Sequence, residues 1–223
     1  MKKLINGIVE FRRTARPEVR KTFAKLALGQ TPDALFVGCS DSRVVPNLFA
    51  STDPGDLFVM RNVGNLIPPA GGPHGLSVGD LSEAAALEYS VLHLNVRNII
   101  ICGHSECGAM KALVASSVPE GMPNLEKWLE AGKPAVERLR QGRSPDPTLT
   151  EHNQLSQINV LVQMEHVLTY PAVREAVNAG RLGIFGWYFD IGHADVYAYE
   201  PDEEHFVLLD ETEGQRLLAR MRQ

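Results

Sequence analysis

Apolar residues are concentrated in a few short, continuous runs along this chain. Two of these runs, at 34–39 and 98–103, are typical of strands buried on both faces, and a third run predicts a strand at 56–61. A fourth strand is expected over 183–191, and shorter runs at 195–199 and 205–209 favour a terminal hairpin.

Longer segments with helical spacing of apolar residues separate these runs. Between 77 and 94 the apolar residues recur every three or four positions, which predicts a helix with acidic residues in its first turn. The Gly- and Pro-rich stretch 66–76 before it predicts a loop. A further helix is expected to begin within 108–113, and others are expected over 123–140, 149–169 and 171–179.

The ends of the chain complete the expected architecture. Residues 1–28 place apolar residues among basic ones and predict one or two amphipathic helices, broken near Pro17. Because strands alternate with helices, we expect an α/β fold. Its central sheet is mostly parallel, has about four strands and is flanked by helices. We expect residues 1–223 to form a single domain, with 1–28 as a helical arm.

Composition excludes several classes of protein. The 223 residues include 27 acidic and 22 basic ones, so the net charge of −5 gives no footprint for nucleic acid or for a membrane surface. No apolar stretch approaches the ~20 residues that a membrane span needs. The basic start lacks an apolar segment, and an odd count of three cysteines argues against a disulfide framework. We therefore expect a cytoplasmic protein.

Two short motifs carry the candidate chemistry. Cys39 begins Cys-Ser-Asp-Ser-Arg and His104 begins His-Ser-Glu-Cys-Gly, each just past a predicted strand. Ligands of open parallel sheets bind at this edge. Cys39, His104 and Cys107 form a set of three ligands that leaves a fourth position open, which is the pattern of a catalytic zinc site.

Asp41 and Arg43 are the candidate residues beside this metal. A site with two thiolates is a weak Lewis acid, so its bound water needs help to ionise. Asp41 is placed to orient that water, or alternatively to take the fourth metal position itself in a closed form. Arg43 has the planar fork to clamp the Asp41 carboxylate. The start of a helix at Cys107 is expected to favour its thiolate.

Simpler interpretations stand beside this one. Either motif alone is more often explained by packing, and only the two together favour a metal site. Asp41 and Arg43 alone would also suit an ion pair that stabilises a turn. Cys102 lies within a predicted strand and is expected to be a buried apolar residue. No Cys-x-x-Cys exists for a thioredoxin-type or deaminase-type site.

Several motifs in a fixed order resemble one known family. They run from about Asn6 to Asp210 and are Cys39-Ser-Asp-Ser-Arg43, Phe58-Val-Met-Arg-Asn-Val-Gly-Asn65, Glu88-Tyr-Ser-Val-Leu-His93, Gly103-His-Ser-Glu-Cys-Gly108 and Gly186-Trp187. In this combination the chain resembles the β-class carbonic anhydrases, and most closely the bacterial and cyanobacterial members.

The resemblance implies a cofactor, partners and site residues. It implies one zinc per chain on Cys39, His104 and Cys107, with Asp41 and Arg43 as a catalytic pair. It also implies self-association as a homodimer or dimer of dimers, with a substrate pocket built partly across the interface. The pocket residues map onto Gln30, Phe58, Val63, Tyr89 and Gly108.

One regulatory feature of some family members is expected to be missing here. Their inhibitory bicarbonate site uses a Trp, an Arg and a Tyr, whose positions are Phe36, Arg61 and Phe189 in this chain. A phenylalanine ring donates no hydrogen bond. We therefore expect no such site and an open zinc.

The expected reaction is the reversible hydration of carbon dioxide to bicarbonate and a proton. An alternative on the same site is hydrolysis of carbon disulfide or carbonyl sulfide. An alternative of another class is a zinc-binding interaction protein without turnover. The presence of both Asp41 and Arg43 argues against that last alternative.

Overall fold

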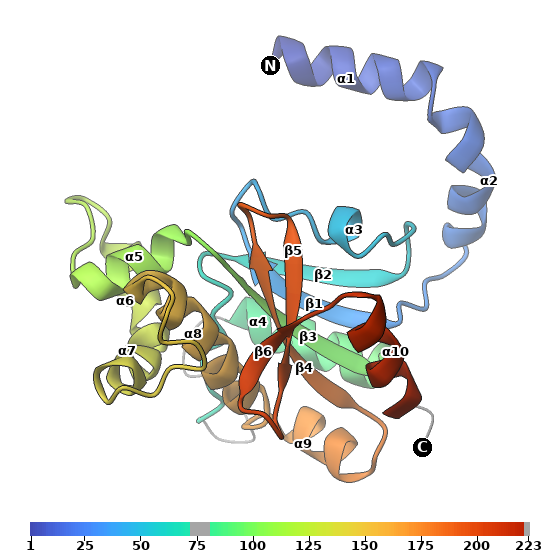
Figure 1. The fold of residues 1–223 in the computed structure, drawn as a ribbon. Coiled ribbons are helices and arrows are strands. Elements are labelled where there is room, and N and C mark those ends of the chain that lie inside the picture. The colour runs from blue at the N-terminus through green and yellow to red at the C-terminus, as the bar shows by residue number, and fades with distance from the viewer. Residues whose placement is uncertain (72–80, 221–223) are drawn as a thin grey trace.

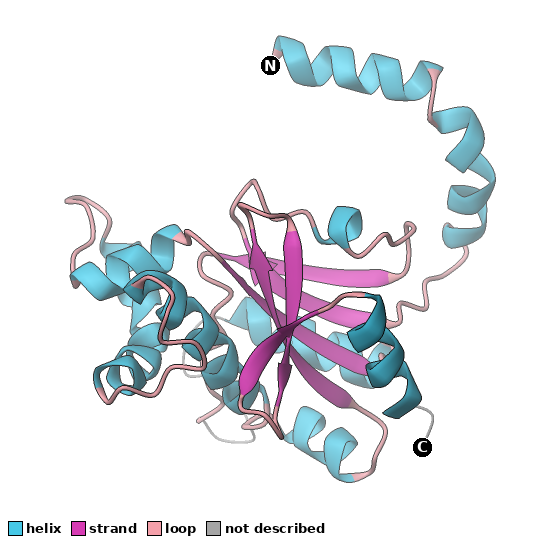
Figure 2. Ribbon diagram, in the orientation of Figure 1, coloured by secondary structure: helices cyan, strands magenta, loops and turns pink. Residues whose placement is uncertain are grey.

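A six-stranded sheet forms the centre of the computed structural model, which describes residues 1–71 and 81–220 (Figures 1 and 2). The strand order is β2-β1-β3-β4-β5-β6. The strands are β1 (Ala34–Cys39), β2 (Leu57–Asn62), β3 (Asn98–His104), β4 (Gly183–Asp190), β5 (Asp195–Glu200) and β6 (His205–Leu208). The first four in this order are parallel, and β5 and β6 add antiparallel strands. The predicted α/β class is thus confirmed.

The sheet was predicted to have about four strands, and it has six, because the predicted terminal hairpin joins it. β5 pairs with β4 from Trp187↔Ala198 to Asp190↔Asp195, so the hairpin extends the same sheet from four strands to six. Its alternating, half-buried residues resemble those of a free hairpin in sequence. Only the pairing with β4 distinguishes the two arrangements.

Helices cover the sheet and build a cluster on one side of it (Figure 1). They are α1 (Lys2–Arg13), α2 (Arg16–Leu26), α3 (Pro46–Phe49), α4 (Leu81–Glu88), α5 (Gly108–Ala115), α6 (Pro123–Leu129), α7 (Lys133–Arg140), α8 (Glu151–Val167), α9 (Pro171–Asn178) and α10 (Glu211–Arg220). The described part of the expected 77–94 helix is α4 continued by a π-helical turn, η2 (Tyr89–His93). The rest of that helix and the end of the 66–76 loop lie outside the described residues.

Three further differences concern helices. A 3₁₀ turn, η3 (Glu130–Gly132), interrupts the expected 123–140 helix. The break precedes Pro134 in the first turn of α7, where a missing N–H does no harm. The sequence interpretation also did not predict the short α3 or α10. None of the helices in the described ranges is long and apolar enough to cross a bilayer.

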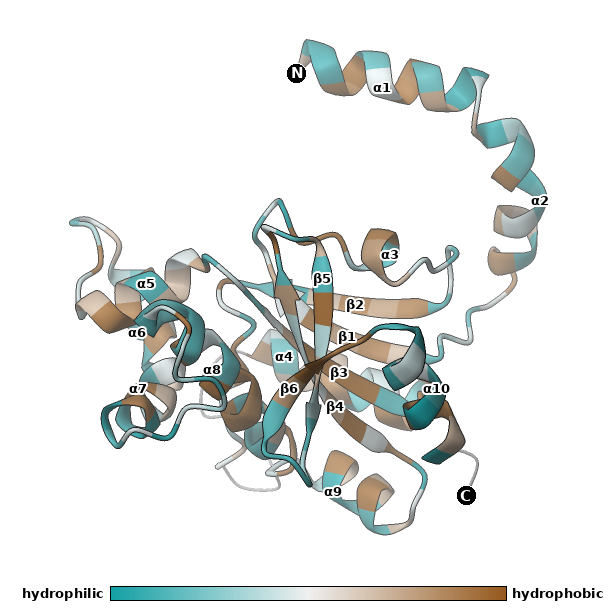
Figure 3. Cartoon of the chain, in the orientation of Figure 1, coloured by the Kyte–Doolittle hydropathy of each residue, from teal (hydrophilic) through white to brown (hydrophobic). Residues whose placement is uncertain are grey.

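Both faces of β1 and β3 are buried, as their continuous apolar runs predict, whereas the edge strand β2 is partly exposed. Leu35 and Val37 of β1 point into a core that they share with α4, α8 and α9. Phe36 points the other way, into a second core with Ile100 and Phe189. Figure 3 shows these strands as mainly apolar. The sheet is therefore a rigid support for side chains at its carboxyl edge.

The helical arm stands away from this body (Figure 1). It consists of two helices, and no residue of α1 or α2 is buried by the described part of the chain. Apolar and polar stretches alternate along it in Figure 3. The arm leaves Leu4, Ile8 and Phe11 exposed. Residues 1–28 hold eight of the chain's 22 basic residues but two of its 27 acidic ones.

Candidate metal centre

Cys39, His104 and Cys107 converge at the carboxyl edge of the sheet. Cys39 ends β1, His104 ends the adjacent strand β3, and Cys107 precedes the first residue of α5. One ligand atom from each lies within 4.8 Å of those of the other two, and all three residues are buried. Residues 65 positions apart in sequence meet here because β1 and β3 are parallel neighbours.

The imidazole of His104 fits a metal ligand. Its Nδ1 lies 2.8 Å from the carbonyl oxygen of Ser105, and because a carbonyl only accepts, Nδ1 carries the proton. Nε2 is then an acceptor, and it is buried without a hydrogen-bond partner among the described residues. A buried acceptor without a partner is costly unless a cation or donor completes it.

The two sulfurs also fit a cation. The Cys107 thiol beside Cys39, together with the Gly64 N–H at 3.4 Å from the Cys39 sulfur, lowers the pKa of Cys39. The Cys39 thiolate in turn raises the pKa of Cys107. The start of α5 does favour the Cys107 thiolate, as expected, but its neighbour outweighs that effect. A bound dication would stabilise both thiolates.

Asp41 and Arg43 form a close pair beside these ligands. The Arg43 side chain donates from Nε to Oδ1 at 2.9 Å and from Nη2 to Oδ2 at 2.7 Å. These bonds hold the pKa of Asp41 well below its usual range. Arg61 braces the same loop by donating to the carbonyl oxygens of Cys39 and Asp41, at 2.9 and 2.6 Å.

The pocket residues divide into two groups. Val63 and Gly108 lie beside the centre, since Val63 precedes Gly64, whose N–H contacts Cys39, and Gly108 follows Cys107. Trp128 fixes the Val63 backbone with a hydrogen bond of 2.7 Å.

The other group lies toward the opposite edge of the sheet. Phe58 pairs with Leu35, four residues before Cys39, which is about 13 Å along the strand at 3.3 Å per residue. Tyr89 contacts Phe58, with ring centroids 5.8 Å apart. Gln30 precedes β1 at the same edge. One chain therefore does not bring these three residues to the metal ligands.

At two of the positions that form the inhibitory bicarbonate site in some family members, this chain has phenylalanine rings packed in its interior. Phe36 is fully buried and meets the edge of Trp187 at 6.5 Å between centroids. Phe189 stacks on Phe49 at 4.7 Å.

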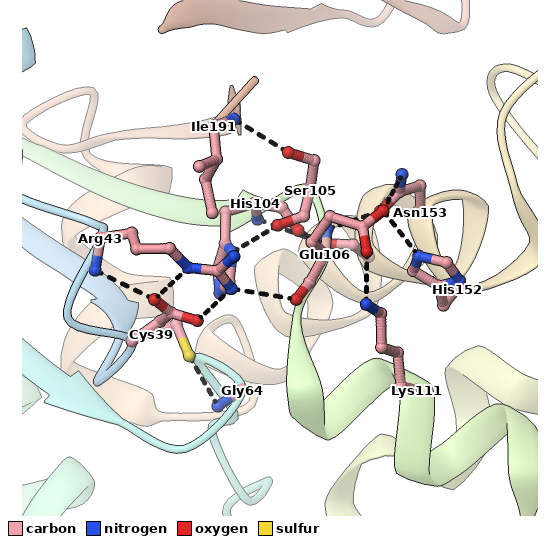
Figure 4. Close-up of polar contacts among 12 residues, drawn as sticks. Cys39, Arg43, Gly64, His104, Ser105, Glu106, Lys111, His152, Asn153 and Ile191 are labelled. Atoms are coloured by element: carbon pink, nitrogen blue, oxygen red, sulfur yellow. Dashed lines mark hydrogen bonds and ion pairs between the residues drawn. The ribbon is translucent and has the colours of Figure 1, made fainter. Parts of the chain in front are cut away.

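A polar network next to His104 was missed by the sequence interpretation (Figure 4). Glu106 contacts His152 and Asn153 of α8 and Lys111 of α5. Lys111 and His152 lower the pKa of Glu106 to about 2. No sequence signal links residue 106 to residues 46 and 47 positions away.

A second missed network is buried between α8 and the loop after β2. Gln163 accepts from the Ile67 N–H at 2.8 Å and donates to Asn159 at 2.9 Å. Asn159 donates to the Gly64 carbonyl at 3.1 Å. These amides hold the loop whose Gly64 N–H reaches Cys39. The sequence did offer a signal for this network, because Asn159 and Gln163 lie among the apolar residues of the segment that forms α8.

Comparisons with known proteins agree with this geometry. A family model described as carbonic anhydrase matches residues 34–196. The carbonic anhydrase of Synechococcus elongatus is 40% identical, over 88% of this chain and 70% of that protein. That of Pseudomonas aeruginosa is 37% identical, over 95% and 93%.

Solved structures extend the similarity to the fold. The β-carbonic anhydrase CcaA superposes with a TM-score of 0.85 at 36% identity, covering 95% of this chain and 92% of that one. A β-carbonic anhydrase of Sordaria macrospora, described as tetrameric, gives 0.74 at 29% identity, covering 89% and 97%. With its Cys-His-Cys cluster at the sheet edge, this chain belongs to the β class of the carbonic anhydrase family.

Proposed function

We propose that this chain binds one zinc ion through Cys39, His104 and Cys107 and hydrates carbon dioxide reversibly to bicarbonate and a proton. The observation that carries the proposal is the buried Nε2 of His104, which has no hydrogen-bond partner among residues 1–71 and 81–220 and lies beside the two cysteine sulfurs. Two thiolates and one imidazole suit zinc, and a fourth position stays open. When bound, zinc supplies Lewis acidity that lowers the pKa of a water molecule.

Asp41 orients the attacking water in this proposal. Because Arg43 keeps the carboxylate ionised, Asp41 remains a hydrogen-bond acceptor and does not keep the proton of the reaction. It therefore aligns a lone pair of the water toward the carbon atom. The proton leaves to solvent or buffer.

A second copy of the chain completes the pocket. Gln30, Phe58 and Tyr89 lie too far from the metal ligands of their own chain, and Tyr89 is 43% exposed. In a self-associated form they would face the Val63 and Gly108 of a partner. The apolar rings suit carbon dioxide, which has no dipole, and the Gln30 amide suits a bicarbonate oxygen.

Two features of the chain support self-association. The arm exposes apolar residues that nothing in the described chain covers, and its net charge is positive while that of the remaining residues is negative. A helix with such a face is stabilised by packing on a complementary surface, here that of a second copy. The tetrameric description of the Sordaria macrospora relative agrees with this proposal.

The proposal is tested by stopped-flow hydration of carbon dioxide with the zinc content measured on the same sample. Removal of the metal with a chelator should abolish turnover, and added zinc should restore it. Turnover that persists in metal-free protein would overturn the proposal.

A further inference from the structure

Glu106 has an unusual backbone conformation at a critical place. It lies between His104 and Cys107, and its φ of +59° is in the left-handed region. Residues other than Gly, Asn and Asp rarely adopt this region, because Cβ crowds the backbone. Interactions around residue 106 must therefore hold the turn that aims both ligands at one point.

Three side chains from two helices hold it (Figure 4). The Glu106 N–H donates to Oδ1 of Asn153 at 2.8 Å. The Glu106 carboxylate contacts Nε2 of His152 at 3.0 Å and forms an ion pair with Lys111. Asn153 is the partner that acts on the backbone itself, so it fixes the orientation of the Ser105–Glu106 peptide, which enters the left-handed turn.

The next peptide, Glu106–Cys107, reaches the catalytic pair, and the φ of Glu106 fixes it relative to the Ser105–Glu106 peptide. The Glu106 carbonyl oxygen accepts a hydrogen bond from Arg43 Nη2 at 3.2 Å. The same nitrogen donates to Asp41 Oδ2. The Arg43 side chain is 47% exposed, so surrounding side chains do not enclose it. The Glu106 carbonyl thus ties Arg43 to the loop after β3, while Asp41 ties it to the loop after β1.

We propose that Asn153 is a positioning residue for the Asp41–Arg43 pair. It acts through the backbone conformation of Glu106, because the turn that it holds places the Glu106 carbonyl, and this carbonyl holds Arg43 where it keeps Asp41 turned away from the metal position. The consequence for catalysis rests on the proposed function, but the effect on Arg43 does not. A purely structural role, in which Asn153 only attaches α8 to the loop, would leave Arg43 unchanged.

The test compares Asn153→Ala with the parent and with Gln154→Ala. Gln154 is the matched control, because it is the next residue of α8 and its amide donates to the carbonyls of Pro147 and Leu149 instead. Hydrogen exchange of the Arg43 Nε–H, followed by NMR, reports on the pair directly and without turnover. We expect exchange about tenfold faster in Asn153→Ala and unchanged in Gln154→Ala.

Activity provides the second readout. Asn153→Ala should keep its zinc and lose about tenfold in kcat, the size usual for residues behind a metal site. Gln154→Ala should keep the parental kcat. If carbon dioxide hydration is absent even in the parent, the proposed function fails, while the Arg43 exchange still tests the positioning role.

A rescue variant separates positioning from misfolding. Asn153→Asp keeps the acceptor for the Glu106 N–H but sets a second carboxylate beside Oε1 of Glu106, which lies 3.4 Å from Asn153 Nδ2. The double variant Glu106→Gln/Asn153→Asp restores a donor–acceptor pair with the same total charge. Its Arg43 exchange should lie closer to the parental rate than that of Asn153→Asp. Parental exchange in Asn153→Ala, or no recovery in the double variant, would overturn the proposal.

Discussion

Arg43 grips both oxygens of the Asp41 carboxylate, with its side chain donating to Oδ1 at 2.9 Å and to Oδ2 at 2.7 Å. The backbone N–H of Arg43 adds a third bond to Oδ1 at 3.0 Å. A carboxylate engaged in this way is not available as a metal ligand. While the pair with Arg43 is intact, Asp41 leaves the fourth metal position open, and when the pair is broken Asp41 can occupy that position.

Loss of Arg43 should close the site. Arg43→Ala removes both side-chain bonds, so Asp41 is free to turn onto the metal and displace the water. We expect zinc to be retained and turnover to fall at least a hundredfold, as for a misplaced catalytic group. A crystal structure of the variant should place an Asp41 oxygen about 2.0–2.2 Å from zinc.

Arg138→Ala serves as the control for this prediction. Arg138 forms an ion pair with Glu165 of α8, away from the site. Its loss should leave turnover near the parental value. If Arg43→Ala also hydrates carbon dioxide at the parental rate, the Asp41–Arg43 pair is only a structural ion pair.

Substitution of a cysteine in the cluster and substitution of Cys102 should differ sharply in their effect on metal content. Cys107→Ser should lose most of the zinc, because a site with three protein ligands cannot spare one. Cys102 is the matched control, since it is equally buried but lies within β3 outside the cluster. Metal analysis of purified protein should show full occupancy in Cys102→Ala. Full zinc in Cys107→Ser would mean that the ligand set is wrong.

Mixing two inactive variants should restore activity if the pocket spans two chains. Cys107→Ser removes the metal half of the site, and Gln30→Ala removes the half that we assign to the partner. A mixed dimer contains one site with both halves intact, so refolding an equal mixture should recover about a quarter of the parental activity, since half of the dimers formed at random are mixed. Stopped-flow assays of the mixture and of each variant alone measure this. A mixture as inactive as its components would place Gln30 in the site of its own chain.

The parallel part of the fold could be predicted because strands buried on both faces have continuous apolar sequences. The run from Ala34 to Cys39 is one of them, and every residue in it is buried. The antiparallel extension by β5 depends on pairing with β4, a non-local contact that its half-polar residues do not specify. Similarly, α10 is held to the body by bonds such as that from Arg220 to the buried Glu200, which join distant parts of the chain.

The candidate site shows the same division. The ligand cluster could be predicted because Cys39 and His104 each lie at the carboxyl end of a strand, and the carboxyl ends of neighbouring parallel strands lie together. The polar contacts that support this cluster could not be predicted from the sequence. Asn153 and Asn159 reach the loops at Glu106 and Gly64 only because α8 packs against β3 and β4, and helix position is set by packing rather than by local sequence.

Activity should rise smoothly with pH, as one ionisation of the attacking water. The pKa of Asp41 is depressed, so its pair with Arg43 is intact above the ordinary range of a carboxyl group, near pH 4, and is lost only as the pH falls below it. Between pH 6 and 9 the pair therefore does not titrate. Nothing in it should produce a steep loss of activity below about pH 8.

Bicarbonate should inhibit only as a product that competes at the metal. The rings of Phe36 and Phe189 are packed in the core and donate no hydrogen bonds, and Arg61 already donates to the carbonyls of Cys39 and Asp41. An anion there would lose its hydration without gaining partners. Initial rates measured against pH and bicarbonate concentration test this directly. A sigmoidal pH profile, or a crystal near pH 7 with Asp41 on zinc and bicarbonate beside Arg61, would contradict the open site.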